Sequence, residues 1–230
     1  MKTVAIQIGP LAIHWYSLMI LLGILAGVKL ARINAKRWGE DVEHFYNIAL
    51  YGTVAGIICA RAYYVAFQWG PYYSRHPQDI IAVWQGGLAI HGAVIGAIAA
   101  CAFYCWRHRL DILKYFDLAA PALLLGQVIG RWGNFFNREA YGAPALVPTW
   151  WPGNSLDNLP AYLPWGIAID ASHRIAPYDD LLLYPATGPQ QVLFHPTFLY
   201  ESLWDLLGLS IILWLMRRLT LPRGNVLLLY

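Results

Sequence analysis

Long apolar stretches separated by polar segments make up most of this chain. A helix needs about 20 mostly apolar residues to cross the hydrocarbon core of a bilayer. The apolar stretches predict five such helices, at about residues 13–28, 46–67, 87–104, 116–132 and 197–216. A sixth begins at Asn225 and the chain stops at Tyr230, so we expect residues 1–230 to form a single membrane-embedded domain that is truncated at its C-terminus.

Composition supports the membrane assignment. Hydrophobic residues make up 58% of the chain and charged residues only 13%, whereas soluble domains carry about 25% charged residues. The 11 tryptophans and 15 tyrosines suit the aromatic belts at membrane interfaces. The net charge of +3, without a basic run that contains aromatic residues, predicts no nucleic-acid partner. We therefore expect an all-α polytopic membrane protein, a helical bundle.

The distribution of basic residues predicts the orientation of the spans. The loops after the first, third and fifth spans are basic, with Lys29, Arg32, Lys36, Arg37, Arg107, Arg109, Lys114, Arg217, Arg218 and Arg223. The alternating loops are longer but hold only Arg75, Arg138 and Arg174. Because basic loops stay in the cytoplasm, the N-terminus is expected outside. Only Lys2 precedes the first span, which is the reverse of a signal peptide, so this helix is expected to stay uncleaved.

Small residues recur at every fourth position in three of the predicted spans. They are Gly52, Gly56 and Ala60, then Gly92, Gly96 and Ala100, then Gly126 and Gly130. Such stripes let helices approach closely, so they predict a compact bundle.

Residues 133–195 differ from the other loops in length and composition. Prolines are frequent there, including Pro144, Pro148, Pro152, Pro160 and Pro164, and Trp150, Trp151 and Trp165 lie among them. Proline interrupts helices, so the segment cannot be one long helix. Long loops are usually functional or disordered. We predict an external loop subdomain at residues 133–195; the alternative is a simple connector.

Polar side chains gather at the predicted outer ends of the spans. They are His14, Tyr16, Arg61, His91, Arg131, Asn134, His195, Tyr200 and Glu201. Unrelated polar residues would be scattered over both leaflets, so this grouping predicts one site near the outer leaflet. Asp117, near the inner end of the fourth span, is the exception.

Arg131 is the most informative member of the group. It is expected close to the point where the fourth span becomes a loop. Gln127, Arg131 and Asn134 are spaced i, i+4, i+7 and share one face while the helix lasts. An arginine in a span needs an anion, a carboxylate or water, unless it extends to the interface. Glu139, a few residues on, is placed to bind substrate, to cap the loop or to pair with Arg138.

Other members also allow structural roles. Arg61 paired with Glu201 would hold helices together, and Tyr16 would anchor at the interface. His91 on its own would be a hydrogen-bonded packing residue. However, glycines flank it in the run Gly86-Gly87-Leu88-Ala89-Ile90-His91-Gly92, so a ligand has room to approach its backbone.

Two arginines and a histidine at this depth suit a lipid phosphate. Arginine matches phosphate oxygens in forked geometry, and histidine exchanges protons near neutral pH. The cluster indicates general-base and electrostatic catalysis on an anionic phospholipid. The alternatives are a transporter, which favours polar groups at the midplane and internal repeats that this chain lacks, and a non-catalytic lipid-binding scaffold.

Six segments resemble the bacterial prolipoprotein diacylglyceryl transferases. They are HWY at 14–16, ARAYY at 60–64, GLAIHGAVIG at 87–96, DLAAP at 117–121, GRWGNFFNREAYG at 130–142 and HPTFLYE at 195–201. The resemblance runs from near the N-terminus to the end of the chain, and its longest motif is highly specific.

The resemblance implies an activity. Members transfer a diacylglyceryl group from phosphatidylglycerol to the lipobox cysteine in the signal peptide of a prolipoprotein. A thioether forms and glycerol phosphate leaves, which is the first step of bacterial lipoprotein maturation. The expected location is the bacterial plasma (inner) membrane, and no metal or cofactor is implied. Because the reacting thiol belongs to the substrate, Cys59, Cys101 and Cys105 need no catalytic role.

The resemblance also assigns residues. His91 is the leading candidate for the base, Arg131 is placed to stabilise the leaving phosphate, and Tyr16 is the third catalytic candidate. Arg131 also belongs to the predicted substrate-binding set, whose other members are Asn134, Glu139, Arg61, Glu201, Gly92, Gly142 and His14. Family members have about seven spans and a further catalytic arginine, which is expected beyond Tyr230.

Overall fold

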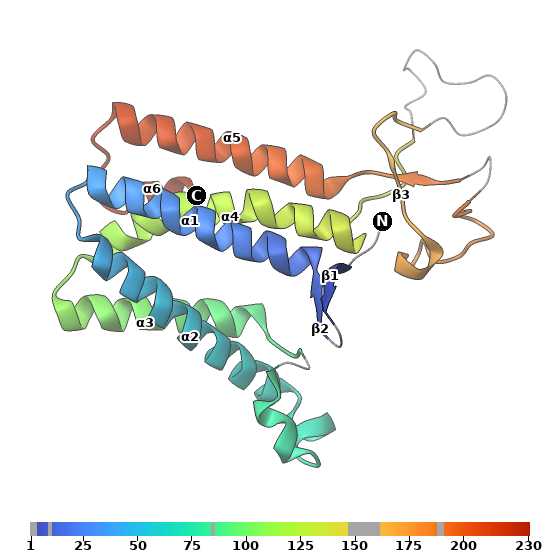
Figure 1. Cartoon of the computed structure of the whole chain (residues 1–230), viewed down its shortest axis with the longest axis horizontal. Coiled ribbons are helices and arrows are strands. Elements are labelled where there is room, and N and C mark those ends of the chain that lie inside the picture. Colours follow the sequence, from blue (N-terminus) through green and yellow to red (C-terminus); the bar gives the residue numbers. More distant parts are fainter. Residues whose placement is uncertain (1–3, 9–10, 84–85, 147–161, 188–190) are drawn as a thin grey trace. The chain divides into compact units, whose positions relative to one another are not determined.

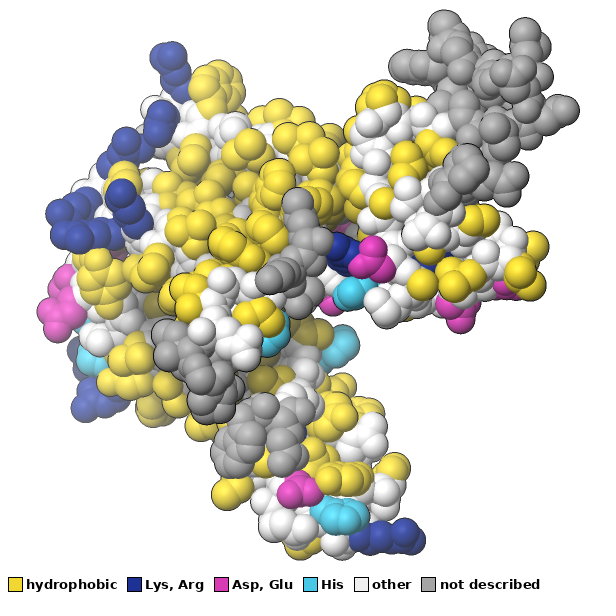
Figure 2. Space-filling model, turned by 45° about the vertical axis from the view of Figure 1, so that its right-hand side comes forward, with side chains coloured by type: hydrophobic (Ala, Val, Ile, Leu, Met, Phe, Trp, Pro, Cys, Tyr) yellow, Lys and Arg dark blue, Asp and Glu magenta, His cyan; other side chains and the backbone are white. Residues whose placement is uncertain are grey.

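Five long helices dominate the protein (Figure 1). The computed structural model describes residues 4–8, 11–83, 86–146, 162–187 and 191–230. The long helices are α1 (Trp15–Arg37), α2 (Val42–Phe67), α3 (Ile90–His108), α4 (Ile112–Asn137) and α5 (Thr197–Arg218). All five are long and apolar enough to cross a membrane, and hydrophobic side chains cover much of the helical surface drawn in Figure 2. The predicted all-α polytopic fold is confirmed.

The chain forms two compact units. The first consists of Met1–Gly27 and Ala122–Arg218, and the second of Val28–Pro121 and Leu219–Tyr230. Helices α1 and α4 therefore each contribute residues to both units. The assignment of residues 1–230 to a single catalytic domain remains a prediction.

In the second unit, α2 and α3 pack through small residues. A Cβ atom on Gly96 would lie 2.5 Å from the carbonyl oxygen of Ala55, and one on Gly56 would lie 3.2 Å from that of Ala93. Backbones approach this closely only where side chains are absent or small. The predicted role of the glycine stripes is therefore confirmed for this pair of helices.

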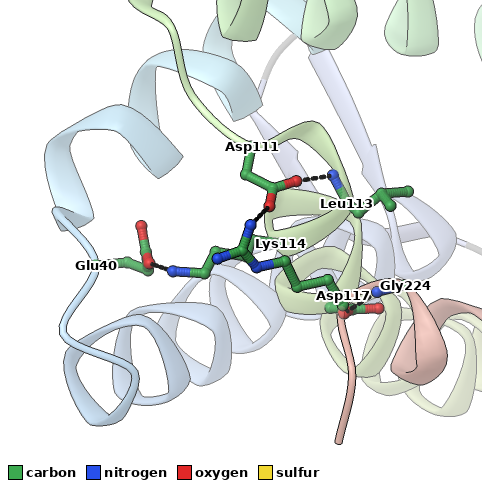
Figure 3. A network of polar contacts seen from close by, with 7 residues as sticks. Glu40, Asp111, Leu113, Lys114, Asp117 and Gly224 are labelled. Atoms are coloured by element: carbon green, nitrogen blue, oxygen red, sulfur yellow. Dashed lines mark hydrogen bonds and ion pairs between the residues drawn. The ribbon is translucent and has the colours of Figure 1, made fainter.

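Asp117, on α4, caps a short helix in the same unit (Figure 3). Its carboxylate accepts hydrogen bonds from the backbone N–H groups of Gly224 at 2.7 Å and Leu227 at 2.8 Å. These groups begin α6 (Asn225–Leu229), and the first N–H groups of a helix have no partner within it. Nearby ion pairs join Lys114 to Glu40 and Arg223 to Asp111. Asp117, the exception to the polar grouping, thus has a structural role.

Replacing Asp117 by alanine is expected to lower the free energy of unfolding by about 0.5–2 kcal/mol, the usual cost of losing a helix cap. Asp117→Asn should lose less, because the amide oxygen keeps one acceptor. Melting temperatures in detergent measure both effects. Asp179→Ala, at an exposed position, is the control. Equal melting temperatures for Asp117→Ala and the control would contradict the stabilising role proposed for the Asp117 cap.

The first unit begins with a β-hairpin that the apolar pattern did not predict. Strand β1 (Val4–Ile8) pairs antiparallel with β2 (Leu11–His14), which leads directly into α1. Glycine again brings helices together, since a Cβ on Gly23 of α1 would lie 3.1 Å from the carbonyl oxygen of Gly126 on α4. The Ser202 hydroxyl of α5 donates to the carbonyl of Val128 at 2.9 Å and fixes α5 against α4.

The segment between α4 and α5 has a small core of its own. Strands β3 (Ile167–Ala168) and β4 (Leu193–Phe194) pair antiparallel there, and Ile169, Val192 and Phe194 are buried. The buried Arg174 guanidinium lies 5.0 Å from the Phe194 ring centre and binds the carbonyls of Ile169, Tyr184 and Pro185. Burial lowers the pKa of Arg174. Pro148, Trp150, Trp151, Pro152 and Pro160 lie outside the described residues.

Candidate functional site

Arg131 pairs with Glu201 of α5. The guanidinium of Arg131 and the carboxylate of Glu201 form an ion pair, and their side chains are 39% and 46% exposed. The sequence placed the end of the helix close to Arg131, which is wrong, because α4 continues to Asn137. Arg131 is therefore held on a regular helix, with a carboxylate as its partner.

Glu139 holds two amide side chains at the end of α4. Its Oε1 atom accepts hydrogen bonds from Nδ2 of Asn134 at 3.1 Å and from Nδ2 of Asn137 at 3.2 Å. Asn137, which the sequence reasoning did not select, ends the helix, and Arg138 follows with a positive φ of 55°. This turn brings the carboxylate back toward Asn134, on the helical face that also carries Arg131.

Tyr16 belongs to the same group. It lies in the first turn of α1, and a Cβ on Gly133 would come 2.8 Å from Cδ2 of its ring. The ring therefore packs on the backbone of α4, two residues beyond Arg131. Trp15 supports this contact by stacking on Phe136, with ring centres 5.1 Å apart. His14 ends β2 and is exposed.

Gly142 packs against the start of α5. Its N–H donates to the carbonyl of His195 at 2.9 Å, and a Cβ would lie 2.9 Å from Cγ2 of Thr197. Close packing is thus a sufficient reason for glycine at this position. Nearby, the hydroxyl of Tyr200 lies 3.0 Å from Nδ1 of His195 and accepts from the Trp165 indole at 2.8 Å.

His91 lies in the other unit, in the first turn of α3. Its side chain is exposed, and its ring stacks on that of Tyr63 with centres 6.0 Å apart. The backbone around it is fixed, because the Ala89 N–H donates to the carbonyl of Ala60 at 3.1 Å. A Cβ on Gly92 would overlap the carbonyl oxygen of Cys59 and lie 2.7 Å from Cβ of Tyr63. Gly92 therefore lets the His91 turn rest directly on α2.

Gly92→Ala is expected to separate α2 from α3 and to destabilise the protein by about 1–3 kcal/mol, as overpacking does elsewhere. Gly208→Ala on α5 is the matched control, because a Cβ there has no neighbour within 4 Å. Thermal unfolding of both variants in detergent checks the difference. A Gly92→Ala variant as stable as the control would contradict the packing described.

Arg61 differs from Arg131 in its surroundings. It is only 7% exposed, and its guanidinium donates to the backbone carbonyl groups of residues 79, 80, 86 and 87. Arg61 and Glu201 each have partners within their own unit: backbone carbonyl groups for Arg61 and the Arg131 guanidinium for Glu201.

The predicted site residues thus fall into two groups. Tyr16, Arg131, Asn134, Glu139 and Glu201 lie together in the first unit, and Arg61, His91 and Gly92 lie together in the second. The meeting of His91 with Arg131 in one site remains a prediction. Among the described residues, no group of three or more His, Cys, Asp or Glu side chains is placed to hold a metal ion.

Five helices that are long and apolar enough to cross a membrane define a multi-pass membrane protein. The sequence matches the family model described as prolipoprotein diacylglyceryl transferase over residues 3–230. The chain belongs to this family, as its motifs predicted.

Several similar proteins carry the name phosphatidylglycerol–prolipoprotein diacylglyceryl transferase. The protein of Geobacillus kaustophilus is 42% identical over 229 residues, which are 99% of this chain and 74% of the relative. That of Bacillus licheniformis is 41% identical over 232 residues, with 100% and 76% covered. That of Chloroflexus aggregans is 42% identical over 209 residues, with 91% and 62% covered.

Proposed function

We propose that the protein transfers the diacylglyceryl group of phosphatidylglycerol to the lipobox cysteine in the signal peptide of a prolipoprotein. The observation that carries the proposal is the family match over residues 3–230, which includes His91 and Arg131. The relatives' names state phosphatidylglycerol and prolipoprotein.

The proposed reaction is a substitution at carbon. A cysteine thiol has a pKa of about 8.5 and is mostly protonated at neutral pH. His91 takes this proton. The thiolate sulfur then attacks the carbon of the diacylglycerol part that carries the phosphate ester. A C–S bond forms, the C–O bond breaks, and glycerol phosphate leaves with the electron pair.

Arg131 stabilises the leaving group in this proposal. The phosphate gains negative charge as the C–O bond breaks, and a fixed guanidinium lowers the energy of that state. The exposure of Arg131 supports the role, because 39% of its side chain is accessible beside Glu201. Glu201 is proposed to orient the guanidinium before lipid binds. When lipid binds, the phosphate replaces the Glu201 carboxylate as the partner of Arg131.

Other residues are assigned from their contacts. Asn134, held by Glu139, is proposed to bind the lipid headgroup together with Arg131. Tyr16 of α1, which packs on Gly133 of α4, is proposed to border the reacting carbon, and the exposed His14 to line the lipid entrance. Gly92 and Gly142 are proposed to act through packing, which allows the neighbouring polar groups to approach.

The proposed location is the bacterial plasma (inner) membrane, with the N-terminus outside and the site near the outer leaflet. Basic residues end three helices: Lys36 and Arg37 on α1, Arg107 and His108 on α3, and Arg217 and Arg218 on α5. Because basic residues favour the cytoplasmic side, these ends are expected inside. The polar groups near the opposite ends then face the outer leaflet, where a secreted acceptor arrives.

Mass spectrometry of the acceptor tests the function. The purified protein is mixed with phosphatidylglycerol vesicles and a lipobox peptide. The expected product is the peptide plus one diacylglyceryl group, formed without loss of an acyl chain. A Cys→Ser peptide is the control and should stay unmodified. An unmodified cysteine peptide after incubation with folded, lipid-binding protein would contradict the transferase and favour a lipid-binding scaffold.

A further inference from the structure

Arg61 binds the backbone of one segment with its whole guanidinium group. Nε donates to the carbonyl of Ile80 at 2.8 Å, and Nη1 donates to those of Gly86 at 2.7 Å and Gly87 at 3.1 Å. Nη2 donates to the carbonyl of Asp79 at 2.5 Å. These acceptors belong to the chain between α2 and α3, so one side chain of α2 fixes the middle of that connection and its end next to α3.

The surroundings of Arg61 stabilise its buried charge in this position. Its side chain is 7% exposed, and its guanidinium carbon lies 5.3 Å from the ring centre of Tyr73. The neighbouring carboxylate of Asp79 accepts a hydrogen bond from the Tyr72 hydroxyl at 2.6 Å, which raises the pKa of Tyr72. Carbonyl dipoles and an aromatic face therefore stabilise the buried cation.

The contact with Arg61 leaves no space for a side chain at Gly87. Its φ is +71°, and a Cβ there would lie 2.6 Å from Nη1 of Arg61 and 2.7 Å from the Tyr64 ring. Gly86 has a similar φ of +87°, but a Cβ there would meet no atom within 4 Å. The sequence suggested that these glycines leave room for a ligand, whereas at Gly87 the space is filled by Arg61 and Tyr64.

The segment that Arg61 binds leads directly to His91. Two residues after Gly87, Ala89 forms the N-cap of α3 and donates to the carbonyl of Ala60, the residue before Arg61. We propose that Arg61 is a positioning residue for His91: it binds the carbonyl groups of residues 79, 80, 86 and 87 and so fixes the turn from which His91 acts. This inference rests on the proposed function, because it takes His91 as the base.

A kinetic comparison separates positioning from direct binding of the lipid phosphate. With Arg61→Ala, kcat should fall about 10–100-fold, the scale of a displacement of about 1 Å at a reacting group, while KM for phosphatidylglycerol stays within about twofold. The kcat of Arg61→Lys should also stay low, because one ammonium group cannot donate to all four of these separated carbonyl groups. The exposed Arg75→Ala is the control and should match wild type.

The two glycines supply a second test that keeps Arg61. Gly86→Ala and Gly87→Ala share the cost of a positive φ, but only Gly87→Ala inserts a methyl group against Arg61. Gly87→Ala should therefore lose more kcat than Gly86→Ala. Combining Gly87→Ala with Arg61→Ala should cost less than the sum of the two single effects, since both act on one contact.

Hydrogen exchange supplies a readout without turnover. In Arg61→Ala, faster exchange is expected around residues 79–80, which lose the bonds to Arg61, and at residues 86–92, with α5 unchanged. Loss of protection throughout α2 and α3 would overturn the inference in favour of general stabilisation. A raised KM with normal kcat, or full activity of Arg61→Ala, would overturn it as well. If wild type itself forms no product, the proposed function fails, and the exchange pattern still decides whether Arg61 holds the segment.

Discussion

Replacing His91 by alanine is expected to lower kcat by about 10²–10⁴-fold at pH 7, the usual contribution of a general base. The variant should stay folded, because the His91 side chain is exposed and its ring has the Tyr63 stacking contact rather than a buried network. Binding of phosphatidylglycerol should change little, since the lipid phosphate is assigned to Arg131. Steady-state kinetics with a lipobox peptide measure the loss.

The pH dependence makes this prediction specific to proton removal. Above a pH of about 8.5 the substrate thiol ionises in water without help from the protein. The difference between His91→Ala and wild type should therefore narrow as the pH rises to 9.5. His76→Ala, which also changes an exposed histidine of this unit, is the control and should behave like wild type. A loss that stays constant over this pH range would show that His91 does not act as the base.

Arg131→Ala should lower kcat by about 10²–10³-fold, which corresponds to about 2.7–4 kcal/mol for the loss of one donor to a developing anion. The effect should fall on kcat more than on KM, because the charge grows only as the C–O bond breaks. Arg131→Lys should recover part of the rate, since it keeps the charge and loses the fork. Single-turnover rates with saturating lipid measure the chemical step directly.

Two further variants interpret the Arg131 result. Arg217→Ala, in the last turn of α5, removes a charge far along the helix from Glu201 and should leave the rate unchanged. Glu201→Gln should cost less than Arg131→Ala, because the amide oxygen still accepts from the guanidinium. Near wild-type turnover of Arg131→Ala would show that Arg131 has no catalytic role. A larger loss of rate in Glu201→Gln than in Arg131→Ala would assign the catalytic role to the Glu201 carboxylate instead.

The spans were predictable because a membrane helix is encoded locally. Apolar length alone found all five helices and the start of α6, but α1 continues to Arg37, well beyond its predicted end near Val28, because the last turns of this helix are polar. The end of α4 was placed too early, because Gly130, Arg131 and Gly133 interrupt the apolar pattern. The helix continues nonetheless, since Tyr16 packs on Gly133 and Trp15 stacks on Phe136. Such contacts depend on a distant part of the chain.

Depth along a helix was predictable, but the direction of a side chain around it was not. The sequence placed Arg61, Arg131 and Glu201 at one level and offered only Arg61 as a pairing partner of Glu201, whereas the structure pairs Arg131 with it. The partners of Arg61 are carbonyl groups, which every residue carries and no motif reveals. Asp117 was unexplained for the same reason, because it binds backbone N–H groups more than 100 residues away.

The fate of one oxygen atom tests the central claim most directly. Phosphatidylglycerol is labelled with ¹⁸O at the oxygen that joins the diacylglycerol carbon to phosphorus, and the products are weighed after reaction with the lipobox peptide. Attack of sulfur on carbon predicts that released glycerol phosphate keeps the label and that the peptide thioether has none. Label retained on the diacylglycerol part, or a peptide thioester beside a lysolipid, would contradict the account.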